Sequence, residues 1–565
     1  MNSLPVGQAA FVLSETGVSV TTLPLRTAPE RAPLQWNEPA VRDILRSWSD
    51  KARSVCLITP PSAFLLDERV FVSLGVLKVA ASLEAQNYRV NFLDLSGVEN
   101  YLAPLEDYLV TCQDAAIGIT ATTPQLPAVM RIAATIRRLR PDLKLILGGP
   151  HVTLVYSAKK LEHKRGISDG RGHRSAAQLE AAFDVLCSGD GELAIFEALK
   201  DDAPKVVDGD DPRGGLFLTD QLFTDGPLPA RHLVDLKSYR YSIEGNRATS
   251  LIAQLGCPFG CGFCGGRNSK SLRVIRNRSV ASILHEVEHL HAHYGYTGFM
   301  FYDDELNVSK SFVELMNGLC DLQSRLGTEF RLRGFVKAEL FTQTQAEAMV
   351  RAGFRWLLCG FEAANERILC NIDKRATLAD NDRCVELAKT AGLKVKALMS
   401  CGHPGESEKT IADIRNWLIR REVDDFDCTI ITTYPGTPYY DLAVRHPTTE
   451  RVWTYAHPKT GDRLHSHEID YTTCADYYKG DPNGGYRSFV FTDHLSCERI
   501  VRLRDEVERD VRRVLRIPFN PGAAALRYEH SMGQGLPEFI HRAGKPHVAA
   551  APIESVGPER AIARS

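Results

Sequence analysis

The chain has 565 residues, of which 44% are hydrophobic and 24% are charged, and its formal net charge is −2. This composition is typical of a globular protein, and the length calls for two or three domains. The charge gives no electrostatic basis for bulk binding to nucleic acid or to an anionic membrane. No run of residues approaches the roughly 18 apolar positions of a membrane span, and residues 1–10 lack the pattern of a signal peptide. We therefore expect a cytoplasmic protein with no nucleic-acid or membrane partner.

After an irregular lead-in over residues 1–50, short apolar strands alternate with amphipathic helices up to residue 200. This alternation predicts a parallel, doubly wound sheet in a domain of residues 51–200. The Lys-, Arg-, Gly- and His-rich segment 157–176 is expected to be an exposed insertion, and residues 201–247 to be a linker. The expected strands lie within 54–61, 89–97, 115–123, 143–151 and 183–192.

Small residues and glycine-rich turns follow these five strands. Because ligands of open α/β sheets bind at the carboxyl ends of the strands, we expect a large cofactor there, although ordinary turn chemistry would look similar. No G-x-G-x-x-G motif opens the first helix, so a dinucleotide is not supported. The candidate residues are Thr59, Pro60, Ser96, Thr120, Gly148, Gly149, His151, Gly189, Gly191 and Glu192.

A second alternation of strands and helices occupies residues 248–445 and predicts a partial or full β/α barrel. Beyond it, residues 446–542 should form a mostly helical region that includes an amphipathic helix over 499–518, and residues 543–565 a disordered tail. Segment 465–488 is dense in Tyr, His and Asp, which suits a polar substrate pocket or lid as well as a solvent-facing loop. The expected barrel strands lie within 250–256, 298–304, 330–336, 356–362, 394–402 and 427–438.

The run GCPFGCGFCGGRN places Cys257, Cys261 and Cys264 in a C-x3-C-x2-C spacing directly after the first barrel strand. Thiolates are the ligands of iron–sulfur clusters, and three of them leave one iron of a cubane open to a small molecule. A structural zinc site is the alternative, but zinc requires a fourth Cys or His, and none lies nearby in a paired spacing. We therefore predict a [4Fe–4S] cluster. The scattered cysteines are interpreted as core residues.

The three-cysteine loop resembles the signature of the radical S-adenosylmethionine (SAM) superfamily, and the resemblance covers approximately residues 248–445. It implies that Phe263, before the last cysteine, lies near the adenine of SAM. It also implies that the strand-end residues Asp303, Asp304 and Glu305 hold the methionine end, and that Glu362 approaches the ribose or amine. The segment 399–410, which contains Gly402, is similar to the fifth-strand element of that superfamily. The alternative is that these carboxylates are solvated or cap helices, as carboxylates at strand ends often do.

A doubly wound domain before such a barrel resembles the cobalamin-binding subclass of radical SAM enzymes. The strand-end residues given above for segment 54–200 then become cobalamin contacts. The D-x-H-x-x-G motif is absent there, so the resemblance implies cobalamin without a protein histidine on cobalt. Arg69 is our candidate for the residue facing the lower side of the corrin. A surface arginine paired with Asp67 or Glu68 is the alternative.

The resemblance implies that one SAM supplies a methyl group through cobalamin, while a second is cleaved reductively to a radical that activates an unreactive carbon of the substrate. We therefore expect a C-methyltransferase acting on a small molecule, such as a natural product, with an external electron donor of the flavodoxin or ferredoxin type. No catalytic side chain beyond the cofactor contacts is assigned. A cobalamin-dependent cyclase or oxidase without methyl transfer, or a non-catalytic cobalamin-binding protein, remains an alternative.

Overall fold

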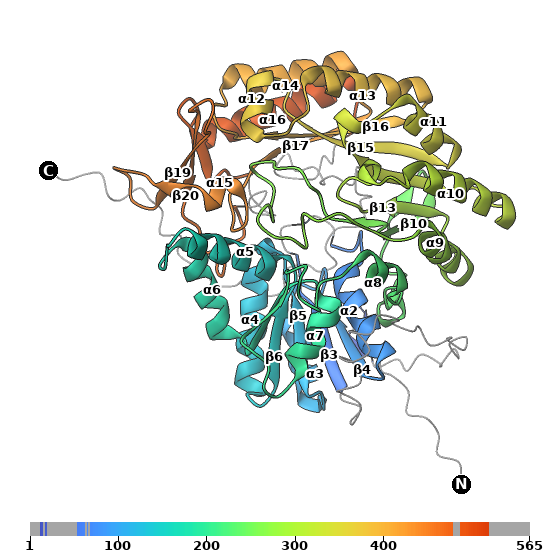
Figure 1. Ribbon diagram of the computed structural model, residues 1–565, viewed down its shortest axis with the longest axis vertical. Helices are drawn as coiled ribbons and strands as arrows, with labels where there is room; N and C mark the ends of the chain where they lie inside the picture. Colours follow the sequence, from blue (N-terminus) through green and yellow to red (C-terminus); the bar gives the residue numbers. More distant parts are fainter. Residues whose placement is uncertain are drawn as a thin grey trace, which may run out of the picture.

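The computed structural model describes residues 12–14, 17–19, 54–62, 65, 68–477 and 486–518. Two α/β halves lie one above the other, and elements from the end of the chain lie beside the upper half (Figure 1). The predicted lead-in and tail lie outside the described residues, apart from a short hairpin of β1 (Val12–Ser14) and β2 (Gly17–Ser19). No described helix has the length and apolarity to cross a membrane.

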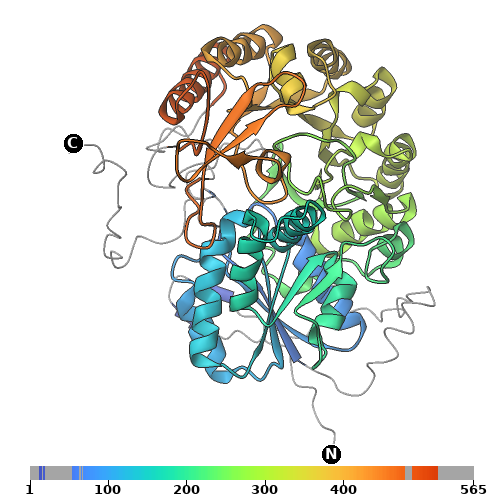
Figure 2. The ribbon, with the colours of Figure 1, turned by 60° about the vertical axis from the view of Figure 1, so that its left-hand side comes forward.

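The lower half contains a parallel sheet of six strands in the order β4-β3-β5-β6-β7-β8. Helices cover both of its faces (Figure 2), which confirms the doubly wound prediction. The strand order reverses between β3 and β5, and the carboxyl ends at such a reversal are where open α/β sheets bind ligands. The strands are β3 (Ser54–Thr59), β4 (Arg89–Asp94), β5 (Ala116–Thr120), β6 (Lys144–Gly148), β7 (Val185–Gly189) and β8 (Val206–Gly209).

Two helices of this half include residues of segment 157–176. The prediction that this segment is an exposed insertion is therefore wrong. Residues 157–176 belong to α5 and α6, and Arg171 at the start of α6 is buried between the rings of Tyr440 and Trp453. Long-range stacking of this kind leaves no local sequence signal. The helices are α2 (Leu74–Ala85), α3 (Leu102–Thr111), η1 (Thr123–Gln125), α4 (Leu126–Leu139), α5 (Pro150–Lys164), α6 (Arg171–Ala182) and α7 (Gly191–Leu199).

The segment expected as a linker contributes to both halves. Strand β8 adds to the first sheet, and β9 (Ser242–Ile243) pairs with the second. Between them lie α8 (Asp220–Asp225) and η2 (Arg231–Leu233). Arg231 is buried and forms an ion pair of 2.6 Å with Glu286 of the upper half. The connection between the halves is therefore packed and charge-paired.

The upper half contains a second sheet, in the order β17-β16-β15-β14-β13-β10-β9, in which six strands are parallel. Its two end strands do not pair with each other in the described residues, so the sheet is a partial barrel, as predicted. Side chains alternate between a face packed under helices and a face toward the concave interior, which we call the lumen. The parallel strands are β10 (Asn246–Leu251), β13 (Gly298–Phe301), β14 (Arg331–Val336), β15 (Phe354–Glu362), β16 (Lys394–Cys401) and β17 (Asp425–Ile430).

Helices follow each of these strands and cover the outer face, as Figure 1 shows. Leu290, Leu319 and Trp417 from three of them are at most 1% exposed in the core that they share with the strands. The helices are α9 (Val280–Tyr294), η3 (Leu306–Val308), α10 (Phe312–Leu326), η4 (Ala338–Leu340), α11 (Gln343–Arg351), α12 (Glu366–Ile372), α13 (Leu378–Ala391) and α14 (Glu408–Arg421).

The C-terminal region, expected to be mostly helical, contains the predicted long helix α16 and also a four-stranded sheet in the order β18-β19-β20-β21. The β-branched and aromatic residues of VWTYA favour a strand and are the signal for β19. Part of the Tyr-rich segment, residues 478–485, lies outside the described residues. The elements are α15 (Pro438–Asp441), β18 (Val444–Arg445), β19 (Val452–Ala456), β20 (Arg463–His467), β21 (Val490–Thr492) and α16 (Cys497–Leu515).

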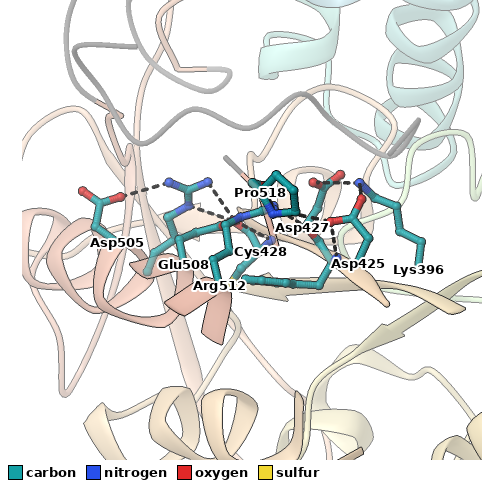
Figure 3. A network of polar contacts seen from close by, with 10 residues as sticks. Lys396, Asp425, Asp427, Cys428, Asp505, Glu508, Arg512 and Pro518 are labelled. Atoms are coloured by element: carbon teal, nitrogen blue, oxygen red, sulfur yellow. Dashed lines mark hydrogen bonds and ion pairs between the residues drawn. The ribbon is translucent and has the colours of Figure 1, made fainter. Parts of the chain in front are cut away.

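Helix α16 covers the free edge of β17, where the barrel is open (Figure 3). Arg512 donates to the Phe426 carbonyl at 2.9 Å, and Arg504 donates to the Cys428 carbonyl at 2.8 Å. Glu508 lies between the two arginines and accepts the Cys428 N–H at 3.2 Å. Because all three side chains are buried, they satisfy backbone groups that an edge strand would otherwise leave unpaired.

Candidate active site

The three cysteines lie in one loop between β11 (Gln254–Leu255) and β12 (Arg276–Asn277), which pair with each other after β10. Gly256 begins the loop at φ +85°, where a Cβ would lie 2.1 Å from the Val274 carbonyl oxygen, so only glycine fits. The Cys264 N–H donates to the Cys261 carbonyl at 3.0 Å. These constraints place all three thiols on the same tight loop, as the sequence predicted.

Burial raises the pKa of each of these thiols, that of Cys264 to about 12. Positive side chains oppose this effect: Arg267 lowers the pKa of Cys264, and Lys374 and Lys337 lower that of Cys261. Within the described residues, no three His, Cys, Asp or Glu side chains are placed to hold a single metal ion. Three thiols among three cations form a donor set that fits an anionic thiolate-ligated cluster.

Arg267 and the residues around Gly262 hold the loop in shape. Arg267 donates to the Cys257 carbonyl at 2.9 Å and to the Phe259 carbonyl at 2.6 Å. A Cβ on Gly262 would lie 2.2 Å from Cε1 of Tyr439, whose N–H donates to the Gly262 carbonyl at 2.9 Å. The loop is thus packed against the segment that follows β17.

The carboxylates after β13 divide into two kinds. Asp303 is buried and accepts the N–H groups of Ala253, at 2.8 Å, and Gln254, so it braces the chain that leads into the cysteine loop. Asp304 and Glu305 remain accessible, yet the surrounding protein raises their pKa, that of Glu305 to about 7. These two are close enough to Cys257 for their charges to raise its pKa as well.

Glu362 lies at the end of β15 with φ +66°, a conformation uncommon outside glycine. Its carboxylate accepts the Ser400 hydroxyl at 2.7 Å and lies 3.5 Å from Lys374 Nζ. The Ser400 hydroxyl in turn lies 2.8 Å from His403 Nε2. Strain that is held by a charged and hydrogen-bonded neighbour is typical of functional positions.

Phe263 and Gly402 meet this network. The Phe263 ring lies 5.5 Å from that of His403 in an edge contact, and Gly402 has φ +93°. His403 is fully buried, and burial lowers its pKa to about 3, so it is neutral. The structure therefore brings together the cysteine loop and the ends of β13, β15 and β16.

Sequence reasoning missed two lysines. Lys337, after β14, is buried, donates to the Lys374 carbonyl at 3.2 Å and lies 4.1 Å from the centre of the Phe259 ring. Lys374 is also buried, and its pKa is raised, most strongly by the charge of Glu362. Lys337 could have been found from the sequence, because it directly follows a predicted barrel strand. Lys374 follows α12 and has no comparable signal.

The strand-end residues of the first sheet meet at the strand-order reversal. Thr59 ends β3 and Pro60 follows it, and Gln125 donates to the Pro60 carbonyl at 3.2 Å. A Cβ on Gly149 would lie 2.6 Å from Oγ1 of Thr120. The turns after β3, β5 and β6 are therefore packed closely together, and Gly148 is the last residue of β6.

The remaining predicted residues hold neighbouring loops. A Cβ on Gly189 would lie 2.4 Å from the Asp210 nitrogen, and one on Gly191 would lie 2.9 Å from a Val79 methyl. His151 is buried, has its pKa lowered to about 3 by burial, and lies 3.0 Å from the Thr123 hydroxyl. Glu192 begins α7 and is half-buried.

Arg69 joins the turns after β3 and β4. It donates to the Ser96 carbonyl at 2.9 Å and to the Ser238 hydroxyl at 2.6 Å, and it lies 3.4 Å from the Asp94 carboxylate. Asp67, one of the two alternative partners, lies outside the described residues. Arg69 thus ties the predicted cofactor edge to the connecting segment.

The two halves contact each other at the cysteine loop. Asp210, after β8, accepts the Ser269 hydroxyl at 2.6 Å, and the Ser271 N–H and hydroxyl at 2.8 and 2.7 Å. A Cβ on Gly265 would lie 3.1 Å from a methyl of Leu154 on α5. Elements at the carboxyl edge of the first sheet therefore build part of the loop that carries the three cysteines.

Each half of the chain matches the model of a known protein family. The radical SAM superfamily matches residues 251–418, and the B12 binding domain matches residues 68–194. An uncharacterized methyltransferase of Pyrococcus horikoshii is 24% identical over 402 residues, which are 70% of this chain and 84% of the relative. Hopanoid C-3 methylase of Methylococcus capsulatus is 23% identical over 428 residues, 71% of this chain and 75% of the methylase.

A solved structure has the same fold. The radical S-adenosylmethionine methyltransferase TsrM of Kitasatospora setae, with cobalamin and a [4Fe–4S] cluster bound, superposes with a TM-score of 0.55 at 18% identity. The superposition covers 82% of this chain and 91% of TsrM. A doubly wound domain followed by a partial barrel is therefore an arrangement that both proteins have.

Proposed function

We propose that this chain, a cobalamin-dependent radical SAM enzyme, transfers a methyl group from SAM to a carbon centre of a small-molecule substrate such as a natural product. Its cofactors are a [4Fe–4S] cluster, SAM and cobalamin. The observation that carries the proposal is the contact of Asp210 and Leu154 with the cysteine loop, since the two edges for which we propose cofactors then lie next to each other. The names of the two relatives and of TsrM support methyl transfer.

Cys257, Cys261 and Cys264 would hold the cluster, and Arg267, Lys337 and Lys374 would favour the thiolate form of these ligands. When bound, the cluster supplies the electron that cleaves SAM, and cobalamin carries the methyl group. The lysines and Arg267 also balance part of the negative charge in a site with low access to water.

The accessible carboxylates Asp304 and Glu305 would receive the amino group of SAM. Glu362, fixed by Ser400 and Lys374, would receive the ribose hydroxyls or the amine. Phe263 and Gly402 would border the adenine. Asp303 would contribute indirectly through one carboxylate oxygen, which accepts two backbone N–H groups. These groups would orient SAM toward the cysteine loop.

The turns after β3 to β7, with the residues predicted there, would bind cobalamin. Gly149 and Gly189 allow the neighbouring turns to approach closely, so the edge presents backbone to a large planar ligand. His151 already contacts the Thr123 hydroxyl, which agrees with cobalamin held without a histidine on cobalt. Arg69 would face the lower side of the corrin from its position between Asp94 and Ser96.

For the substrate and the reductant we propose a chemical class and a protein type. The described parts of segment 465–488, residues 465–477 and 486–488, would border a polar substrate pocket, and a flavodoxin or ferredoxin would supply electrons. Thiolate ligands must stay reduced, which suits the cytoplasm.

The test is anaerobic reconstitution of the full chain with iron, sulfide and cobalamin, followed by incubation with a low-potential reductant such as dithionite and with SAM carrying a trideuterated methyl group. Methyl transfer predicts that the label appears on extracted cobalamin and, with a screened substrate, as a mass gain of one labelled methyl group. A Cys257→Ala, Cys261→Ala, Cys264→Ala variant is the matched control and should give no labelled product. A product without added methyl would favour cyclase or oxidase chemistry instead.

A further inference from the structure

A buried series of polar side chains leads from the interior of the upper half to Glu362. Three of its members are at most 3% exposed: Ser400, His403 and Tyr439. Glu362, at the end of the series, is half-buried. Ser400 belongs to β16, and His403 lies two residues beyond that strand. The series therefore joins a shielded interior to one of the proposed SAM contacts.

The hydrogen atoms along this series can be assigned from the contacts. Glu362 accepts the Ser400 hydroxyl at 2.7 Å, so the single hydroxyl hydrogen of Ser400 is used there. His403 Nε2 lies 2.8 Å from the same hydroxyl oxygen, and it must then be the donor. Burial lowers the pKa of His403 to about 3, so the ring is neutral. Its one N–H group is therefore on Nε2, and Nδ1 is an acceptor.

Two aromatic rings hold the ring of His403 in place. Phe263 lies 5.5 Å from it and Tyr439 lies 6.2 Å from it, both in edge contacts. The Tyr439 hydroxyl is also 3.5 Å from Nδ1. Because Phe263 is proposed to border the adenine, His403 touches one proposed SAM contact directly and reaches another through Ser400.

The orientation of Glu362 depends on this support. Its backbone has φ +66°, which is uncommon outside glycine, and its carboxylate lies 3.5 Å from Lys374 Nζ, at the long limit of a hydrogen bond. Among the described residues, only Ser400 donates to this carboxylate at a short distance. The direction of the carboxylate therefore rests mainly on Ser400, and that of the Ser400 hydroxyl rests on His403.

We propose that His403 is a positioning residue for SAM, because its Nε2–H group fixes the Ser400 hydroxyl, which in turn fixes Glu362. The inference rests on the proposed function and adds a residue that acts through its neighbours. A hydroxyl oxygen that accepts from Nε2 keeps its own hydrogen directed at the carboxylate. Without that donor the hydroxyl can rotate, and SAM must order Glu362 when it binds, which lowers the affinity.

The experiment measures the Kd of SAM by calorimetric titration of the anaerobically reconstituted protein, with no reductant added, so that SAM is not cleaved. His403→Leu keeps an apolar group beside Phe263 but removes the donor, and it should raise Kd about twofold to tenfold. In His403→Gln the amide nitrogen can take the place of Nε2, so Kd should return to the wild-type value. In His403→Asn the amide nitrogen takes the place of Nδ1, and Kd should stay raised.

A control and a double substitution separate positioning from a loss of packing. His291→Leu, at a histidine of α9 whose Nδ1 lies 3.0 Å from the Tyr296 carbonyl, should keep the wild-type Kd. Ser400→Ala should itself raise Kd, and adding His403→Leu to it should change Kd by less than about twofold. Urea unfolding of the same variants identifies any that do not fold.

Additive effects of His403→Leu and Ser400→Ala, or an equal loss of affinity in His403→Leu and His403→Gln, would overturn the proposal. Labelled methyl on cobalamin is measured separately, with reductant present. If label forms while His403→Leu keeps the wild-type Kd, the positioning role is wrong and the proposed function stands. If the Kd values follow the predicted order but no label forms, methyl transfer is wrong and the positioning role stands. A wild type that does not bind SAM would overturn both.

Discussion

Replacing Asp210 by alanine should loosen the cysteine loop without touching any proposed cofactor ligand. Its carboxylate accepts three hydrogen bonds from Ser269 and Ser271, at 2.6 to 2.8 Å, and all three residues are at most 4% exposed. Each buried donor left without a partner costs about 1–3 kcal/mol. The three share one acceptor and are not additive, so we expect a loss of about 3–5 kcal/mol in the free energy of unfolding.

The assay is urea unfolding followed by tryptophan fluorescence, together with the iron content of anaerobically reconstituted protein. Asp210→Ala should unfold at lower urea concentration and retain less iron than the wild type, and Asp210→Asn should be intermediate because one acceptor oxygen remains. Asp211→Ala removes the adjacent carboxylate, which is 42% exposed beside Arg213, and should change neither quantity. Wild-type stability and iron content in Asp210→Ala would refute the claim that the first sheet supports the cluster loop.

Three further changes test other parts of the structure. Burial raises the pKa of Glu406 to about 7, so its contribution to stability is fully present below pH 4.5 and is lost as the pH rises toward 7. Glu406→Gln should flatten the dependence of unfolding on pH, by up to about 3 kcal/mol at pH 8 relative to pH 4.5. Gly262→Ala places a methyl group 2.2 Å from Tyr439 and should lower the iron content severalfold. Glu508→Ala removes the carboxylate that two buried arginines share and leaves each with one other acidic partner, Asp505 or Asp425, and should destabilise the protein by about 1–3 kcal/mol in urea titrations.

For each of these three substitutions, one outcome would contradict the prediction. An unaltered pH profile in Glu406→Gln would mean that another group dominates the titration. Gly75→Ala, at a glycine with open space around it, should keep full iron content, and an equal loss there would show that the effect of Gly262→Ala is not local. A stable Glu508→Ala would show that the edge of β17 does not need α16.

The strands and their functional ends could be predicted because they depend on local patterns. Parallel strands buried on both faces give apolar runs, and their carboxyl ends meet at one edge whatever the rest of the chain does. The spacing of Cys257, Cys261 and Cys264 is equally local. These patterns alone predict that the Cys257 loop, Glu305 and Glu362 lie near one another.

Contacts between side chains far apart in the chain could not be predicted from the sequence. Arg171 is buried between two rings that lie about 270 residues later, so its segment looked like an exposed insertion. The sequence gives no signal that one carboxylate oxygen of Asp303 accepts the backbone N–H groups of Ala253 and Gln254. Lys374 follows α12 and lies 3.5 Å from Glu362, a contact that no local pattern predicts.

The most direct test of the central claim is electron paramagnetic resonance of the anaerobically reduced, reconstituted protein with and without SAM. If Cys257, Cys261 and Cys264 leave one iron open for SAM, the wild type should give a [4Fe–4S] signal whose g values change when SAM is added. The variant with alanine at all three positions should give no such signal. A cluster signal that persists in that variant, or a wild-type signal that SAM leaves unchanged, would contradict the account.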